Sequence, residues 1–120
     1  MKGSSNFEVA NVWDERVVSA LVKIAEDDLQ SQRWARDFSD KLRQRKISVE
    51  EIRRAVANAD AIVLYWHKGR WAFGFWNEQM SLIAVWSPYR PSRWVTAFHN
   101  RAGKDYLMTR EDAELLWATR

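Results

Sequence analysis

The hydrophobic period of the chain changes near residue 60, and this change constrains the fold more than any other feature. Before that point, apolar residues recur every three to four positions, which is the spacing of amphipathic helices. From Ala61 onward, short apolar runs alternate with polar breaks, which is typical of an antiparallel meander. We therefore expect an α+β fold in which two to three N-terminal helices pack on one face of a four- to five-stranded antiparallel sheet.

The first half predicts three helices, over about residues 14–29, over about residues 33–45 and after Ser48. The third helix has the clearest start, because Ser48 followed by Glu51 is a capping box. Only a short link separates the second and third helices, so we expect these two helices to meet at a sharp angle.

The second half predicts four strands and a short fifth one, over about residues 61–67, 70–76, 80–86, 93–99 and 104–108. Lys68 and Gly69 suit a tight hairpin between the first two strands. Thr109 followed by Asp112 resembles a second capping box and predicts a terminal helix. The expected single domain of residues 1–120 comprises a flexible arm over 1–10, helices over 14–58, a sheet over 60–108 and a terminal helix over 110–118.

Tryptophan is unusually frequent, and five of the eight tryptophans fall in the predicted sheet: Trp66, Trp71, Trp76, Trp86 and Trp94. One buried tryptophan removes about 150–250 Å² from water, and a domain of this size has little room to bury eight. We expect several to be partly exposed on the sheet face that points away from the helices. In the fourth strand, simple alternation places Trp94, Thr96 and Phe98 on the same face.

Composition argues against disulfide-linked, cysteine–zinc and membrane-spanning proteins. The chain has no cysteine, which excludes a disulfide scaffold and a cysteine-based zinc site. No stretch approaches the roughly 18 apolar residues of a membrane span, so we expect no membrane partner. The N-terminus lacks the apolar core of a signal peptide, which predicts action in the cytoplasm. A domain delivered into a target cell as part of a larger secreted protein fits the same observations.

Charge is unevenly distributed along the chain. Residues 1–32 carry 3 basic and 6 acidic side chains (−3), residues 33–54 carry 8 and 4 (+4), and residues 90–110 carry 5 and 1 (+4). If the two basic segments converge on one face, they form a patch that attracts phosphate backbones. The alternative is that these charges only solvate helix faces.

The residue types favour chemistry without a metal or cofactor. The two histidines, His67 and His99, have no carboxylate at ligand spacing, and the few glycines form no phosphate-binding loop. Metal-free RNA cleavage needs only a base, an acid and groups that hold a charged phosphate. His67, Thr96 and His99, which lie in or at the ends of predicted strands, are the candidate catalytic residues.

Three segments, residues 38–52, 61–65 and 94–98, together resemble the small ribonuclease toxins of the barnase–EndoU–colicin–RelE group. In that group a helix ends in an arginine, an optional glycine and an isoleucine, a second helix follows, and the last strand carries a threonine. The resemblance covers about residues 36–108. It implies a helix pair on a curved antiparallel sheet and metal-independent endoribonuclease activity through attack of the 2′-OH. It also implies an acidic inhibitory partner, such as an immunity protein or antitoxin.

Within this resemblance, Arg45 matches the arginine of the helix step and Thr96 matches the last-strand threonine. Two positions differ, because Asp37 stands near the place of an early helical histidine and Lys46 replaces the glycine of the step. The predicted RNA-binding residues are Arg45, Lys68, Arg70, Arg93 and Arg101. The alternatives are a non-catalytic protein-interaction module that uses a tryptophan-rich sheet face, and a nucleic-acid binder that does not cut.

Overall fold

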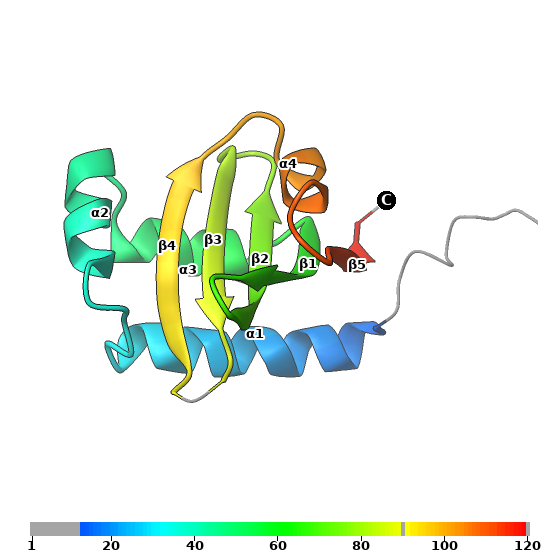
Figure 1. The fold of residues 1–120 in the computed structure, drawn as a ribbon, viewed down its shortest axis with the longest axis horizontal. Coiled ribbons are helices and arrows are strands. Elements are labelled where there is room, and N and C mark those ends of the chain that lie inside the picture. Colours follow the sequence, from blue (N-terminus) through cyan, green and yellow to red (C-terminus); the bar gives the residue numbers. More distant parts are fainter. Residues whose placement is uncertain (1–12, 90, 120) are drawn as a thin grey trace, which may run out of the picture.

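The computed structural model describes residues 13–89 and 91–119 of the chain. It has the predicted α+β architecture, with N-terminal helices packed on a five-stranded antiparallel sheet (Figure 1). The arm expected over residues 1–10 lies outside the described residues. The elements are, in chain order, α1 (Glu15–Gln30), α2 (Phe38–Arg45), α3 (Val49–Ala57), β1 (Ala61–His67), β2 (Arg70–Asn77), β3 (Leu82–Ser87), β4 (Arg93–His99), α4 (Lys104–Met108) and β5 (Glu114–Ala118).

The sheet has the strand order β4-β3-β2-β1-β5, and each neighbouring pair is antiparallel. The predicted hairpin between β1 and β2 is confirmed, because Lys68 and Gly69 both have positive φ (49° and 85°), as a tight two-residue turn requires. Figure 1 shows α2 beside β4 at one edge of the sheet and α1 and α3 behind the strands, while α4 and β5 lie near β1.

The helix starts follow their capping signals. The Asp14 carboxylate accepts hydrogen bonds from the backbone N–H of Arg16 and Val17, both at 3.0 Å. The predicted capping box of α3 is confirmed: Ser48 N–H donates to Glu51 Oε1 at 2.8 Å, and Glu51 N–H donates to Ser48 Oγ at 3.0 Å. Each such cap stabilises a helix by about 1 kcal/mol.

The second helix is shorter than the sequence predicts, because residues 33–35 pair with a strand instead of coiling. Trp94 N–H donates to the Arg33 carbonyl and Ala35 N–H donates to the Trp94 carbonyl, both at 2.7 Å. These bonds satisfy backbone groups at the outer edge of β4, which would otherwise be left unpaired. The need to cover that edge therefore overrides the helical spacing of the first residues of this segment.

The predicted order of the last two elements is wrong. Residues 104–108 form the helix α4 rather than a strand, and the predicted helix over 110–118 contains the strand β5. β5 pairs with the edge of β1 that β2 leaves free. Apolar runs of about five residues do not distinguish a strand from one buried helical turn, so the sequence pattern alone could not settle this order.

Three of the five tryptophans predicted to lie in the sheet are buried in the core. Trp94 and Trp86 are 0% and 2% exposed on the side of α1–α3, and Trp76 is 9% exposed on the other side, near α4. Trp71, at 41%, is the most exposed tryptophan of the described residues, and alternation puts it on the helix-facing side. The expectation of several exposed tryptophans on the face away from the helices is therefore wrong, because that face is partly covered.

A bulge in β4 corrects the predicted faces of that strand. The register shifts beside Val95, so Trp94 pairs with Trp86 and Thr96 pairs with Val85. Trp94 therefore belongs to the core under α1–α3, whereas Thr96 and Phe98 lie on the opposite face of the sheet. One extra residue in the strand turns Thr96 away from the buried tryptophan.

Candidate functional site

The sheet face opposite α1–α3 has a covered part and a more open part. In the covered part, α4 packs so closely that a Cβ added to Gly74 would lie 2.6 Å from the Leu107 side chain. A Cβ added to Gly103 would lie 2.3 Å from the Trp76 ring. In the more open part, Thr96 and Phe98 are only half-buried. The candidate site is built around these two residues.

Arg45, the last residue of α2, reaches Thr96 at the edge of this open part. Its Nη1 donates to Thr96 Oγ1 and to the Ala97 carbonyl, both at 2.8 Å. The guanidinium carbon lies 5.9 Å from the centroid of the Phe98 ring. The structure thus brings together two residues that the sequence singled out 51 positions apart. Because Thr96 Oγ1 accepts from Arg45, its own hydroxyl proton is free to donate to a ligand.

The contacts continue from Arg45 across the sheet face. The rings of Phe98 and Tyr106 meet edge to face, with centroids 5.7 Å apart. The Arg110 guanidinium lies 5.5 Å from the Tyr106 centroid. We call these five residues, Arg45, Thr96, Phe98, Tyr106 and Arg110, the cationic patch. Its two arginines form no ion pair with any carboxylate among the described residues.

Tyr65 and His67 of β1 adjoin the cationic patch. Their rings meet edge to face at 5.9 Å. Burial raises the pKa of Tyr65 to about 12, with a smaller opposing effect of Arg110. Burial also lowers the pKa of His67, followed by the charges of Lys68, Arg110 and Lys41. Near neutral pH the patch therefore adjoins a neutral, half-buried imidazole that can accept a proton and a neutral phenol that is buried.

Two further predicted cations, Arg70 and Arg93, begin β2 and β4. Arg70 Nη2 donates to the Tyr89 carbonyl and, at 2.8 Å, to the Pro91 carbonyl, so it holds the loop between β3 and β4. Arg93 lies next to Ser87 in the register of β3 and β4. The Nε atoms of both arginines are buried and have no hydrogen-bond partner among the described residues.

The remaining predicted residues are dispersed. His99 ends β4 near the β2–β3 turn, where its Nδ1 lies 3.1 Å from the Met80 carbonyl and 3.3 Å from the Ser81 carbonyl. Strand alternation puts it on the opposite face from Thr96, so these two candidate catalytic residues do not share a surface. Arg101 is exposed in the turn after β4, and Lys68 is exposed at the hairpin tip.

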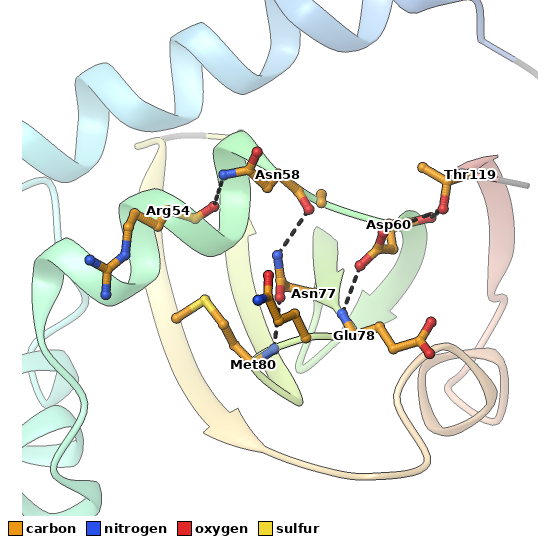
Figure 2. A pocket seen from close by; sticks show the side chains of 9 residues that line it. Arg54, Asn58, Asp60, Asn77, Glu78, Met80 and Thr119 are labelled. Atoms are coloured by element: carbon orange, nitrogen blue, oxygen red, sulfur yellow. Dashed lines mark hydrogen bonds between the residues drawn. The ribbon is translucent and has the colours of Figure 1, made fainter.

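A hollow lies elsewhere, between the end of α3, the β2–β3 turn and Thr119 (Figure 2). This depression measures about 860 Å³. Figure 2 shows its polar groups bonded to one another. Asn77 donates to the Asn58 carbonyl and accepts from Met80 N–H, both at 2.9 Å, and Asp60 Oδ2 accepts from Glu78 N–H at 2.7 Å. These bonds anchor the turn, whereas the charged ends of the Arg54 and Glu78 side chains take part in none of them (Figure 2).

Lys46, where the resembling group has glycine, has a left-handed backbone with φ of 57° and ends α2. Glycine is favoured in this conformation. The chain nevertheless forms the left-handed turn after Arg45 with a lysine.

Three residues of the site escaped the sequence analysis: Tyr65, Tyr106 and Arg110. Tyr65 stands two residues before His67, and the period of two along a strand could have put it on the same face. Tyr106 and Arg110 are four apart, which is neighbour spacing in a helix. That relation was hidden because residues 104–108 were predicted to form a strand.

The described part of the chain contains no group of three potential metal ligands. Its helices are also too short or too polar to cross a bilayer, within the residues the structure covers. Comparisons with protein-family models, curated proteins and solved structures found no match. The case for function therefore depends on the geometry of the cationic patch and on the short motifs that carry the resemblance.

Proposed function

We propose that the protein is a metal-independent endoribonuclease whose site is centred on Arg45 and Thr96. The observation that carries this proposal is the 2.8 Å bond from Arg45 Nη1 to Thr96 Oγ1 on a half-open, cation-rich sheet face. A guanidinium beside a free hydroxyl proton suits a phosphodiester, because both groups donate to phosphoryl oxygens that gain charge in the transition state. Action in the cytoplasm and an acidic inhibitory partner belong to the same proposal.

The residues around the patch supply the other groups of such a reaction. His67 is neutral near pH 7 because burial lowers its pKa, so it accepts the proton of the 2′-OH. The 2′-oxygen then bonds to phosphorus, the bond from phosphorus to the 5′-oxygen breaks, and that oxygen takes a proton. Solvent supplies that proton, because the Tyr65 phenol beside His67 is only 4% exposed. The products are a 2′,3′-cyclic phosphate and a 5′-hydroxyl end.

The test is digestion of single-stranded RNA by the purified protein in the presence of a chelator. The decisive variant is Thr96→Val, which keeps the shape of the side chain and removes its hydroxyl. We expect this variant to lose roughly 100-fold or more in cleavage rate. His67→Gln should lose activity as well, whereas His99→Gln, on the other face of β4, should retain it.

Three controls make the result specific. A substrate with a single 2′-deoxy position should resist cleavage at that position, and the products should carry cyclic phosphate ends. Arg43→Ala, on the same helix as Arg45 but paired with Asp40, should cut at the wild-type rate. Equal cleavage by wild type, Thr96→Val and His67→Gln would refute the assignment. Binding without cleavage would instead favour a non-cutting nucleic-acid binder.

The protein-interaction alternative gains no specific support. It required a broad tryptophan-rich face, but Trp76, Trp86 and Trp94 are at most 9% exposed. Their rings stabilise the core and are not available to a partner.

A further inference from the structure

The pair Arg70 and Arg93 differs from the surface arginines that form ion pairs. Arg33, Arg43 and Arg53 each approach a carboxylate within 3.5 Å. Arg70 and Arg93 have no such partner among the residues that the structure describes. They nevertheless lie close enough for the charge of Arg93 to act on Arg70, whose pKa is lowered by burial and then by Arg93.

Some hydrogen-bond donors of this pair also have no acceptor among the described residues. The Nη2 of Arg70 is occupied by two loop carbonyls. Its Nε, and the Nε of Arg93, are shielded from solvent and donate to nothing within the described residues. A buried donor without an acceptor costs about 1–3 kcal/mol. Two neighbouring guanidinium groups without a carboxylate match the requirements of a bound anion, whose charge would offset their repulsion.

The position of the pair relates it to the cationic patch. Arg93 and Thr96 are three residues apart on β4, which corresponds to roughly 10 Å along a strand. Alternation with the bulge at Val95 puts Arg93 on the same side of the sheet as Thr96. Two positively charged sites therefore follow one another along β4. One is formed by Arg45, and the other by Arg70 with Arg93.

We propose that Arg70 and Arg93 form a second phosphate subsite, so that the ligand is a single nucleic-acid strand that engages two phosphates along β4. This inference deepens the proposed function, on which it rests for the nature of the ligand. Arg45 and Thr96 hold the phosphate that reacts, and the pair holds a neighbouring phosphate that does not react. A free mononucleotide can occupy only one of the two sites, so an oligonucleotide is the preferred ligand.

The experiment measures binding of a labelled, single-stranded, all-2′-deoxy oligonucleotide of about ten nucleotides over a range of salt concentrations. This probe has no 2′-OH, so binding is measured without cleavage. Each phosphate neutralised on a single strand contributes about 0.7 to the slope of log K against log salt concentration. Arg93→Gln should lower that slope by about 0.7 and weaken binding, whereas Arg43→Gln should change neither.

Arg93→Lys separates charge from geometry. Lysine keeps the positive charge but lacks the Nε donor of the planar fork, so the slope should stay at the wild-type value while affinity drops a few-fold. A measurement on the wild-type protein avoids any dependence on variant folding. In a nitrogen–proton spectrum, the Nε–H signals of Arg70 and Arg93 should shift when the oligonucleotide is added, and that of Arg43 should not.

An unchanged slope in Arg93→Gln, or an Arg93 Nε–H signal that does not move, would overturn the subsite. A slope lowered by about 0.7 in Arg93→Gln, in a protein that never cuts RNA, would keep the subsite and reject the ribonuclease. Cleavage that depends on Thr96, together with an unchanged slope in Arg93→Gln, would support the ribonuclease and reject the subsite.

Discussion

The depression of Figure 2 and the cationic patch are both polar regions of the same small domain, but their polar groups are used in opposite ways. In the depression, Asn77 is 4% exposed and both ends of its amide are bonded within the protein. At the patch, Arg45 reaches across to Thr96, and no carboxylate of the described chain neutralises it. The depression is a hollow of about 860 Å³, yet the patch has the arginines without a carboxylate partner among the described residues.

This difference indicates which property of a polar region points to a function. A hollow whose polar groups bind each other is already complete, and a ligand would have to compete with those bonds. The patch has cations without counter-ions, a hydroxyl with a free proton and a neutral imidazole. These groups can still bind a ligand. We therefore expect changes near the depression to alter stability, and changes at the patch to alter function.

Gly103→Ala should be the most destabilising of these changes. Gly103 has a φ of 52°, and an added Cβ would lie 2.3 Å from the Trp76 ring, which directly precedes Asn77. Backbone strain of about 1–3 kcal/mol and overpacking of about 1–3 kcal/mol add to a loss of roughly 3 kcal/mol in the free energy of unfolding. Chemical denaturation measures this loss.

The matched control is Gly69→Ala at the hairpin tip. Gly69 also has a positive φ of 85°, but nothing lies within 4 Å of an added Cβ. It should lose only the strain, about 1 kcal/mol. Equal losses at the two glycines would show that the contact between α4 and Trp76 is not close in solution.

Asn77→Ala should destabilise the protein by about 2 kcal/mol, because it leaves the Asn58 carbonyl and the Met80 N–H without their partners. Asn58→Ala removes a bond from an exposed amide to the Arg54 carbonyl and should cost much less. Thermal and denaturant unfolding measure both. RNA cleavage by folded Asn77→Ala should equal that of wild type, and a specific loss of cleavage would mean that the depression belongs to the site.

Arg45→Ala should reverse this pattern. Its bonds to Thr96 and Ala97 are near the surface, so the free energy of unfolding should drop by only about 1 kcal/mol. Cleavage should drop by roughly 100- to 1,000-fold, because a donor to the charged phosphate is lost. The control Arg43→Ala should lose under about 0.5 kcal/mol. An Arg45→Ala protein that cuts normally but unfolds easily would make Arg45 a structural residue only.

The sequence predicted the fold class and the site residues Arg45 and Thr96 for separable reasons. Period changes and the Ser48–Glu51 box are local signals, so β1, β2 and the start of α3 came out nearly as the structure has them. Motif resemblance singled out Arg45 and Thr96 separately, and their contact was not predicted. Its geometry depends on the bulge at Val95, which no local pattern encodes.

The sequence failed where long-range packing decides local structure. Residues 104–108 coil because Leu107 fits against Gly74, and residues 33–35 pair because β4 has a free edge. Neither cause is visible within a short window of sequence. The separation of His67 and His99 is a consequence of strand order and direction, so it too needed the complete topology.

The smallest effect concerns pH and His67. Its pKa in the folded protein lies below the ordinary value of 6.5, first because of burial and then because of Lys68, Arg110 and Lys41. Below pH 6.5 the unfolded chain therefore binds the proton more readily than the folded protein does. Stability should be full above the ordinary pKa and should decline as pH falls through the lowered one.

The melting temperature measured between about pH 5 and pH 8 tests this dependence. His67→Gln should flatten the acidic side of the wild-type profile, and Lys41→Met, which removes one of the cations acting on His67, should flatten it in part. Cleavage should show the same acidic limb, because a protonated imidazole cannot accept the proton of the 2′-OH. If the stability profile flattens in His67→Gln while the acidic limb of cleavage persists, the titration of His67 affects stability but His67 is not the base.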